Sequence, residues 1–270
     1  MTLTTLRLSR SSLQVAWRDH GAGAPVLLIH GVGMQSAAWG PQIEALSDRY
    51  RIIAVDMPGH GESAALPQGS QLPEYVCWLH DFADQLGLGS LSIVGHSMGA
   101  LIAGGFAVQY PQLTRRVALL NGVFRRDAKA RIAVGSRADQ IRSGNIDLET
   151  PLKRWFGDTP SDQAARAKVA DWLSVVHQAG YATAYEAFAR GDDIYADRFA
   201  EINCPFLAIT GEDDPNSTPE MSKEMAATVK DGTAIVVENH RHMVNLTAPG
   251  LVTQHLKNWL QDTPYEEAVG

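Results

Sequence analysis

Short apolar runs alternate along the chain with longer stretches that carry apolar residues on one helical face. The apolar runs are continuous, which is typical of strands buried on both faces of a parallel sheet. Strands are expected at residues 26–30, 51–55, 91–94 and 117–120. Helices are expected between them, at residues 39–50, 72–86 and 100–110. This alternation predicts a mostly parallel sheet that is covered by helices.

The two ends of the chain carry further elements. Residues 6–10 and 13–19 alternate polar and apolar side chains, which predicts two strands joined by a tight turn. Near the other end, another apolar run predicts a strand at residues 206–210. A helix, a strand and a last helix are then expected at residues 219–229, 234–237 and 249–260.

The segment from Phe124 to about Ile202 contains no strand-like run and is too long for an ordinary loop. We expect it to form several short helices. The chain is thus predicted to have a core domain, residues 1–124 and 203–270, and a helical cap inserted at residues 125–202. Both connections to the cap leave the same edge of the sheet, so the cap is expected to cover a site there and to influence substrate choice.

A Gly-x-Ser-x-Gly sequence with Ser97 at its centre joins one of the predicted strands to the following helix. A strand, a sharp turn and a helix are the context of a nucleophile elbow, which exposes the serine hydroxyl above the sheet. Gly95 and Gly99 allow the strand and helix to approach closely. The alternative is a serine in a glycine turn that only packs a helix on a strand. The flanking apolar pattern favours the elbow.

An activated serine needs a base, and the base needs an acid that orients it. Acidic residues and histidines follow the two predicted strands nearest the end of the chain. The strand at 206–210 is followed by Glu212, Asp213 and Asp214, and the strand at 234–237 by His240 and His242. Because parallel strands end at one sheet edge, an acid and a histidine are expected to meet Ser97 there.

Together these motifs resemble the α/β-hydrolase superfamily over nearly the full length of the chain. The matching segments are His30-Gly31, residues 56–63, residues 95–99, residues 211–214, and His242 followed by Pro249. The resemblance implies an α/β fold with an eight-stranded, mostly parallel sheet. Its Gly-x-x-Asp pattern selects Asp214, and the spacing from the histidine to the proline selects His242. Some members carry the acid after the sixth strand, where this chain has Asn121-Gly122, and many carry Glu where it has Thr247.

The resemblance also implies a role for each residue. Ser97 would attack a carbonyl carbon, His242 would transfer the proton, and Asp214 would orient the imidazole. The backbone amides of Met98 and Val32 would stabilise the oxyanion, with Gly33 as the alternative to Val32. No metal or organic cofactor is implied.

The expected activity is hydrolysis of a small ester, lactone or amide through an acyl-enzyme. The chain is most similar to the enol-lactonase and esterase branch, including Arg154-Trp155-Phe156, which suggests a compound from aromatic catabolism. Two alternatives stay open. One is carbon–carbon bond hydrolysis of ring-cleavage diketones with the same triad, and the other is a non-catalytic ligand receptor on this fold.

Four residues are candidates for contact with substrate: Gly33, Arg125, Trp155 and Tyr185. Arg125 and its neighbour Arg126 follow the sixth strand of the core, where a guanidinium group could bind a substrate carboxylate. The competing interpretation places the arginines in surface ion pairs and the aromatic residues in the core of the cap.

Composition narrows the partners and the compartment. The 270 residues carry a formal net charge of −7, which argues against nucleic acid or an anionic membrane as partner. The two cysteines, Cys77 and Cys204, lie far apart and match no metal spacing. We therefore expect a reduced, cytoplasmic protein, a monomer or homodimer, whose partner is a small-molecule substrate.

Overall fold

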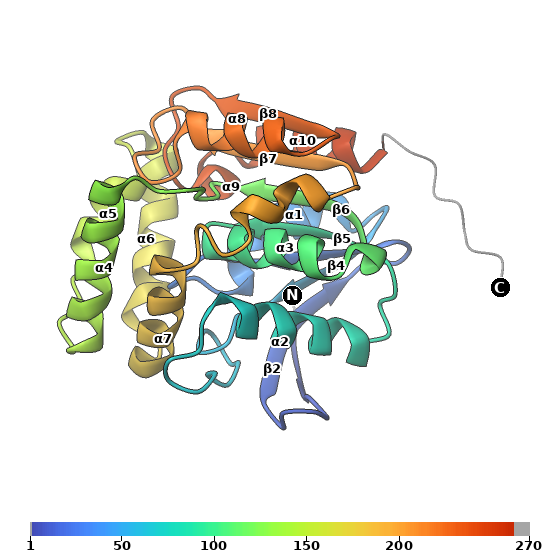
Figure 1. The fold of residues 1–270 in the computed structure, drawn as a ribbon, viewed down its shortest axis with the longest axis horizontal. Helices are drawn as coiled ribbons and strands as arrows, with labels where there is room; N and C mark the ends of the chain where they lie inside the picture. The colour runs from blue at the N-terminus through green and yellow to red at the C-terminus, as the bar shows by residue number, and fades with distance from the viewer. Residues whose placement is uncertain (1, 262–270) are drawn as a thin grey trace.

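Eight strands form a single sheet in the computed structural model, which describes residues 2–261 (Figure 1). They are β1 (Leu3–Arg7), β2 (Gln14–His20), β3 (Pro25–Ile29), β4 (Arg51–Val55), β5 (Leu91–His96), β6 (Thr114–Leu120), β7 (Phe206–Gly211) and β8 (Gly232–Val237). Their order across the sheet is β1-β2-β4-β3-β5-β6-β7-β8. The β1–β2 and β2–β4 pairs are antiparallel, and the remaining pairs are parallel. The predicted fold class is confirmed, while the outermost residues of the predicted core, 1 and 262–270, lie outside the described part.

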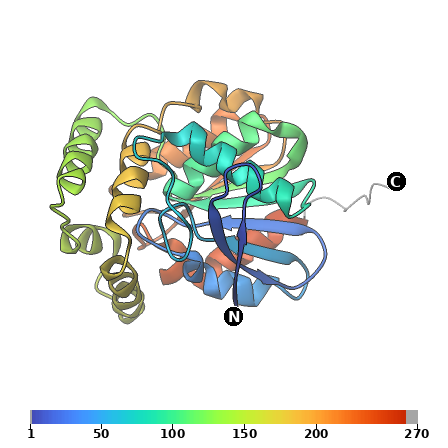
Figure 2. The same cartoon turned by 90° about the horizontal axis from the view of Figure 1, so that it is seen from below.

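Helices cover both faces of this sheet. They are α1 (Gly40–Leu46), α2 (Leu72–Gln85), α3 (Met98–Gln109), α8 (Pro219–Thr228) and α10 (Pro249–Gln261). Buried residues of α1 and α10 pack on one face, and those of α2, α3 and α8 pack on the other. Figure 2 shows α1 and α2 on opposite sides of the sheet. All eleven residues of α3 from Met98 to Val108 are buried, because this helix lies under the cap as well as on the sheet.

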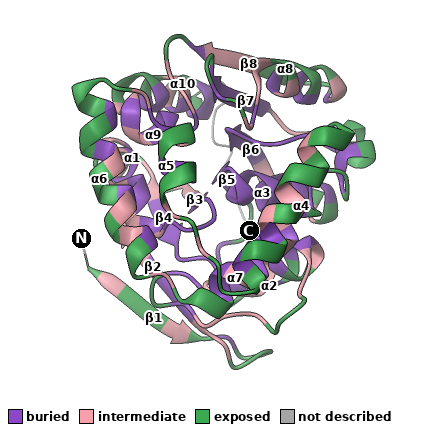
Figure 3. Ribbon diagram, turned by 90° about the vertical axis from the view of Figure 1, so that its left-hand side faces the viewer, coloured by how far each residue is buried: buried purple, intermediate pink, exposed green. Residues whose placement is uncertain are grey.

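The segment between β6 and β7 is helical. It contains α4 (Ala128–Arg142), α5 (Glu149–Trp155), α6 (Pro160–Ser174), α7 (Gln178–Ala189) and the 3₁₀ helix η3 (Ala196–Glu201). Figure 3, viewed from this end of the molecule, shows α4 to α7 in front of the strand ends. Three of these helices begin with side-chain caps: Asp127 accepts a hydrogen bond at the start of α4, Thr159 at α6 and His177 at α7.

Most predicted elements differ from the structure by one to three residues at an end, and two differ more. The first strand was expected at 6–10 but is β1, because residues 8–13 form the turn, with hydrogen bonds between Leu8 and both Ser12 and Leu13. The helix expected at 39–50 is only α1, since residues Ser36–Trp39 form the 3₁₀ helix η1 and residues 47–50 turn into β4. Pattern reasoning also missed the short helix α9 (Val244–Thr247).

The turn between β5 and α3 holds Ser97 at φ 55° and ψ −113°. A non-glycine residue seldom has a positive φ, and such strain persists only where the surroundings impose it. A side chain at Gly95 would overlap the backbone carbonyl of Gly99, and one at Gly99 would overlap that of Ile29. The strand and the helix therefore approach more closely than side chains would allow.

Gly99→Ala is expected to lower the free energy of unfolding by up to about 3 kcal/mol, because the new methyl group meets backbone atoms that cannot rotate away. Gly135→Ala is the matched control: it lies within α4 with open space around it, and the change should stabilise by up to about 1 kcal/mol. Urea unfolding of both variants measures the difference. Equal effects would contradict the close approach at the turn.

Candidate active site

Three side chains from three loops form a hydrogen-bonded chain at the end of the sheet. Ser97 follows β5, Asp214 follows β7, and His242 follows β8. The Oγ atom of Ser97 lies 3.1 Å from Nε2 of His242, and Nδ1 of His242 lies 2.7 Å from Oδ2 of Asp214. All three residues are buried. This is the geometry in which an imidazole takes the proton of a serine hydroxyl and a carboxylate orients the imidazole.

Asp214 is held by donors on both of its oxygens. Oδ1 accepts the backbone amides of Asn216 and Ser217, at 2.8 and 3.2 Å, and Oδ2 accepts Nδ2 of Asn121 at 2.8 Å. Burial alone would raise the pKa of Asp214, but the charge of His242 and these hydrogen bonds outweigh it and lower the pKa. The carboxylate therefore stays ionised beside the imidazole.

The alternative acids and histidine lie elsewhere. Glu212 and Asp213 are exposed, and the amide of Asp213 donates to the backbone carbonyl of His240. His240 contacts Oγ1 of Thr247 through Nδ1 at 2.9 Å, so this threonine supports the last loop. Asn121, at the alternative acid position, supports Asp214 instead of replacing it.

The loop that carries His242 is attached to both the core and the cap. The backbone amide of His242 donates to the carbonyl of Trp155 at 3.2 Å, and the carbonyl of His242 contacts Nε2 of His96 at 2.8 Å. The Trp155 ring stacks near the imidazole, with centroids 5.8 Å apart. Nη1 of Arg241 donates to the carbonyl of Phe156 at 2.7 Å. The position of the imidazole thus depends on the end of α5.

The loop after β3 lies against Ser97, since a side chain at Gly31 would touch the Cβ atom of Ser97. The amide of Gly33 donates to Nε2 of His60 at 2.9 Å, so it is not available to a substrate oxygen. Within residues 2–261 no acceptor pairs with the amide of Val32, which lines the same cavity as Ser97. The amide of Met98 is in the first turn of α3, where helix amides lack intrahelical partners. These two amides fit an oxyanion hole better than that of Gly33.

Three buried histidines support these loops. His30 accepts the amide of Met57 through Nε2 at 2.9 Å, His60 binds Gly33, and His96 binds the His242 carbonyl. Burial lowers the pKa of His30 to about 4 and those of His60 and His96 to about 3. All three are therefore neutral near pH 7 and serve as scaffold.

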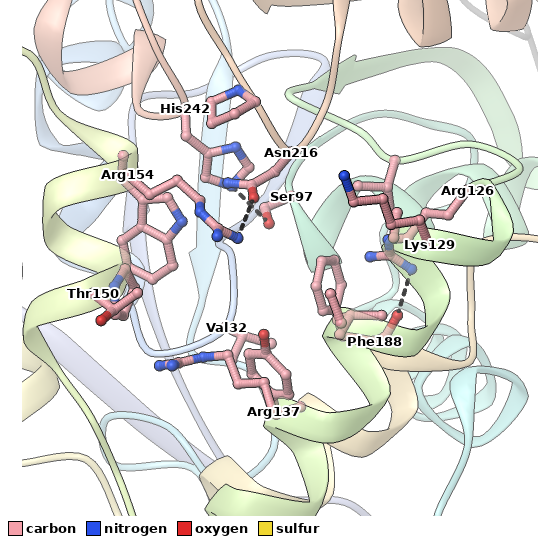
Figure 4. A pocket seen from close by; sticks show the side chains of 18 of the residues that line it. Val32, Ser97, Arg126, Lys129, Arg137, Thr150, Arg154, Phe188, Asn216 and His242 are labelled. Carbon is pink, nitrogen blue, oxygen red and sulfur yellow. Dashed lines mark hydrogen bonds between the residues drawn. The ribbon is translucent and has the colours of Figure 1, made fainter.

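A cavity of about 490 Å³ opens in front of Ser97, between the sheet and the cap (Figure 4). This volume falls in the usual range for small-molecule sites, roughly 300–1,000 Å³. Ser97, His242 and Val32 form its floor, and α4, α5 and α7 contribute its walls. Its apolar lining includes Val123, Ala133, Val134, Pro151, Trp155, Tyr185 and Phe188.

The structure divides the four predicted contact residues. Trp155 and Tyr185 line the cavity. Gly33 does not: its amide binds His60, and Leu173 fills the space where a side chain at Gly33 would stand. Arg125 points away from the cavity and pairs with Asp197 and Glu224 at 2.7 and 3.1 Å, while its neighbour Arg126 takes a place in the wall. Sequence reasoning missed Lys129, Arg137 and Arg154 as lining residues, since only the packing of α4 and α5 decides which side chains face inward.

Residues 2–261 contain neither a metal-ligand cluster nor a membrane-spanning helix. No group of three or more His, Cys, Asp or Glu side chains there is arranged to hold a metal ion. None of the helices in this range has the length and apolar character needed to cross a membrane.

Comparison with known proteins identifies related chains. A family model described as "Alpha/beta hydrolase family" matches residues 26–254. The chain is 50% identical over 264 residues to (E)-2-((N-methylformamido)methylene)succinate hydrolase of Acinetobacter baylyi, covering 98% of this chain and 100% of that protein. A malate-bound thermophilic esterase from Thermogutta terrifontis matches with a TM-score of 0.87 and 24% identity, over 97% of this chain and 98% of that one. The enol-lactonase from Burkholderia xenovorans LB400 gives 0.85 and 23%, over 96% and 100%. The two structural matches concern the fold alone.

Asp214→Asn should reduce kcat by up to about 10⁴-fold, because an amide at this position stabilises the wrong imidazole tautomer. Asp213→Asn removes a neighbouring exposed carboxylate and should leave kcat almost unchanged. Both are measured with any ester that the wild-type protein turns over. The reverse order of effects would show that Asp213 is the orienting acid.

Stability should fall as the pH drops from about 6.5 towards 4. The unfolded chain binds protons on its histidines in this window, whereas folding keeps His30, His60 and His96 neutral. Each proton bound only by the unfolded chain lowers the free energy of unfolding by up to about 1.4 kcal/mol for every pH unit of acidification. His60→Gln should therefore reduce the slope of unfolding free energy against pH, as measured by urea titrations at several pH values. An unchanged slope would contradict a buried neutral His60.

Proposed function

Because the chain belongs to the alpha/beta hydrolase family and is a hydrolytic enzyme, we propose that it cleaves a small acyl compound through a covalent intermediate on Ser97. The observation that carries the proposal is the chain of hydrogen bonds from Ser97 through His242 to Asp214, at 3.1 and 2.7 Å. Ser97 and His242 line a cavity that is large enough for a small substrate.

In the first half of the reaction, His242 removes the proton of Ser97 as the hydroxyl oxygen attacks the substrate carbonyl carbon. The negative charge on the tetrahedral oxygen is stabilised by the amides of Val32 and Met98. Losing one such donor typically raises the activation barrier by about 3 kcal/mol. Backbone amides suit this role because a rigid turn already holds them in position. His242 then donates its proton to the leaving group, and the acyl group stays on Ser97.

In the second half, His242 takes a proton from water, and the resulting hydroxide attacks the acyl-enzyme. The carboxylic acid leaves, and Ser97 regains its proton. Asp214 stays ionised throughout and stabilises the positively charged imidazole, in line with its lowered pKa. The cap keeps bulk water out of the cavity while the substrate is bound.

Among ester, lactone and amide bonds, we assign the amide first. The Acinetobacter baylyi relative is 50% identical over nearly all of both chains, and its name describes a substrate with an N-methylformamido group, which contains a carbon–nitrogen acyl bond. An amide needs its nitrogen protonated as it leaves, and His242 is within hydrogen-bond distance of the reacting oxygen to supply that proton. The substrate is the small-molecule partner that we propose for this chain.

Ser97→Ala should lower kcat by on the order of 10⁶-fold, because the covalent route is lost. Circular dichroism should show an unchanged fold, since alanine has no polar group to satisfy. The assay uses purified protein with small formamides, aryl esters, enol-lactones and ring-cleavage diketones. More than a tenth of wild-type activity in the variant would rule out Ser97 as nucleophile, and turnover of diketones alone would overturn the amide assignment in favour of carbon–carbon hydrolysis.

A further inference from the structure

The cavity has a charge opposite to that of the whole chain. Four basic side chains line it, namely Arg126, Lys129, Arg137 and Arg154. Its single acidic lining residue is Asp127, whose carboxylate accepts the amide of Ala130 at 2.7 Å as the cap of α4. The chain as a whole has a formal net charge of −7. A positive cavity in an acidic protein favours the entry of anionic substrates.

Arg126 is the buried member of this group, and its charge is already neutralised. Its Nη1 atom lies 3.0 Å from Oδ1 of Asp192, and both side chains are almost completely buried. Its backbone amide donates to the other oxygen of the same carboxylate at 2.6 Å. Arg126 therefore fixes the wall between α4 and α7 through its pair with Asp192, although its Nη2 atom has no hydrogen-bond partner among the described residues.

Arg137 and Arg154 are held differently, by neutral acceptors. Nη2 of Arg137 donates to the backbone carbonyl of Asp147 at 2.7 Å, and its guanidinium lies 5.7 Å from the centre of the Tyr185 ring. Nη1 of Arg154 donates to the side-chain oxygen of Asn216 at 3.3 Å. In the part of the chain that the structure describes, neither guanidinium has a carboxylate within ion-pair distance. Both groups are oriented, but their positive charges are not neutralised.

One carboxylate near Arg137 is committed to other donors. Asp147 accepts the amides of Glu149 and Thr150 through Oδ1, at 2.9 and 3.1 Å. The pKa of Asp147 is lowered chiefly by a side-chain hydrogen bond from Thr150 and then by the backbone amides of Thr150 and Glu149, with Arg137 as the smallest contributor. Asp147 is therefore bound to the first turn of α5 and leaves the guanidinium free to face the cavity.

The two arginines reach into the same space from opposite walls. Figure 4 shows Arg154 extending from α5 towards Ser97, and Arg137 extending from α4 across the cavity below it. Asn216 connects Arg154 to the reaction centre. The backbone amide of Asn216 donates to Asp214, and its side-chain oxygen accepts from Arg154. A guanidinium group offers parallel donors that match the two oxygens of a carboxylate.

We propose that Arg137 and Arg154 bind a carboxylate group of the substrate, so that the enzyme acts on small acids that carry a free carboxylate beside the acyl group attacked by Ser97. The proposal rests on the proposed function, because it assigns a substrate-binding role to two further residues of the cavity that contains Ser97. Recognition then divides between the core, which breaks the bond, and α4 and α5 of the cap, which select the charge.

The test measures binding without turnover. Succinate is titrated by calorimetry into the Ser97→Ala protein, with succinamide as its neutral isostere and inorganic phosphate as a second anion. Succinate should bind at least about 10-fold more tightly than either, since a charge-assisted hydrogen bond is worth more than a neutral one. Equal affinity for succinamide would overturn the carboxylate site, and equal affinity for phosphate would reduce it to a general anion site and overturn the assignment to carboxylates.

Variants then locate the site. Arg154→Gln and Arg137→Gln, each in the Ser97→Ala protein, should weaken succinate binding about 10-fold or more. Arg142→Gln is the matched control: it removes one positive charge from the last turn of α4, where Arg142 pairs with Asp139 and does not line the cavity. Arg154→Lys keeps the charge but loses the paired donors, and should weaken binding less than Arg154→Gln. Equal effects of Arg142→Gln and Arg154→Gln would overturn the proposal.

The proposed function is tested separately by labelling wild-type Ser97 with a fluorophosphonate. Labelling without succinate binding would refute the carboxylate site and leave the proposed function intact. Succinate binding without labelling would refute the serine mechanism and leave the carboxylate site intact. Both results with the expected variant pattern support the two proposals together.

Discussion

The turn that holds Ser97 at φ 55° constrains the rest of the site. A backbone in this region costs on the order of 1–3 kcal/mol, so the surroundings must impose it. The amide of Ser97 donates to the carbonyl of Leu120 at 2.9 Å, and Gly95 and Gly99 let β5, α3 and the end of β3 pack without side chains between them. The same contacts bring the loop after β3 against Ser97. This packing therefore positions Ser97 together with the backbone amides of Met98 and Val32.

The cap is more than a cover in this structure, because it shares hydrogen bonds with the loop of His242. Trp155 accepts the His242 amide, and Arg241 donates to the carbonyls of Lys153 and Phe156 at the end of α5. Arg154 precedes Trp155 in α5. Its side chain lines the cavity and donates to Asn216 beside Asp214. One helix therefore contacts the base, the acid loop and the proposed substrate carboxylate. A change in the position of α5 is expected to alter binding and catalysis together.

The sheet and the order of Ser97, Asp214 and His242 could be predicted from the sequence because buried strands and tight turns leave strong local patterns. Pattern reasoning misplaced β1 and lengthened α1, since a turn at Leu8 and a turn at residues 47–50 interrupt apolar spacing that looks regular. It chose Arg125 over Arg126 and did not identify Arg137, because the cap helices carry apolar and charged residues without a clear periodic face. Which side of α4 meets the cavity is decided by its packing against α7, a contact between segments far apart in the sequence.

Ser97 is expected to carry the acyl group during turnover. Rapid acid quenching of the enzyme with an excess of an activated ester, followed by mass spectrometry of the peptide that contains Ser97, tests this directly. This peptide should gain the mass of the acyl group in the steady state and lose it once the substrate is exhausted. Turnover with no acylated peptide at any time, or with the acyl group on another residue, would contradict it.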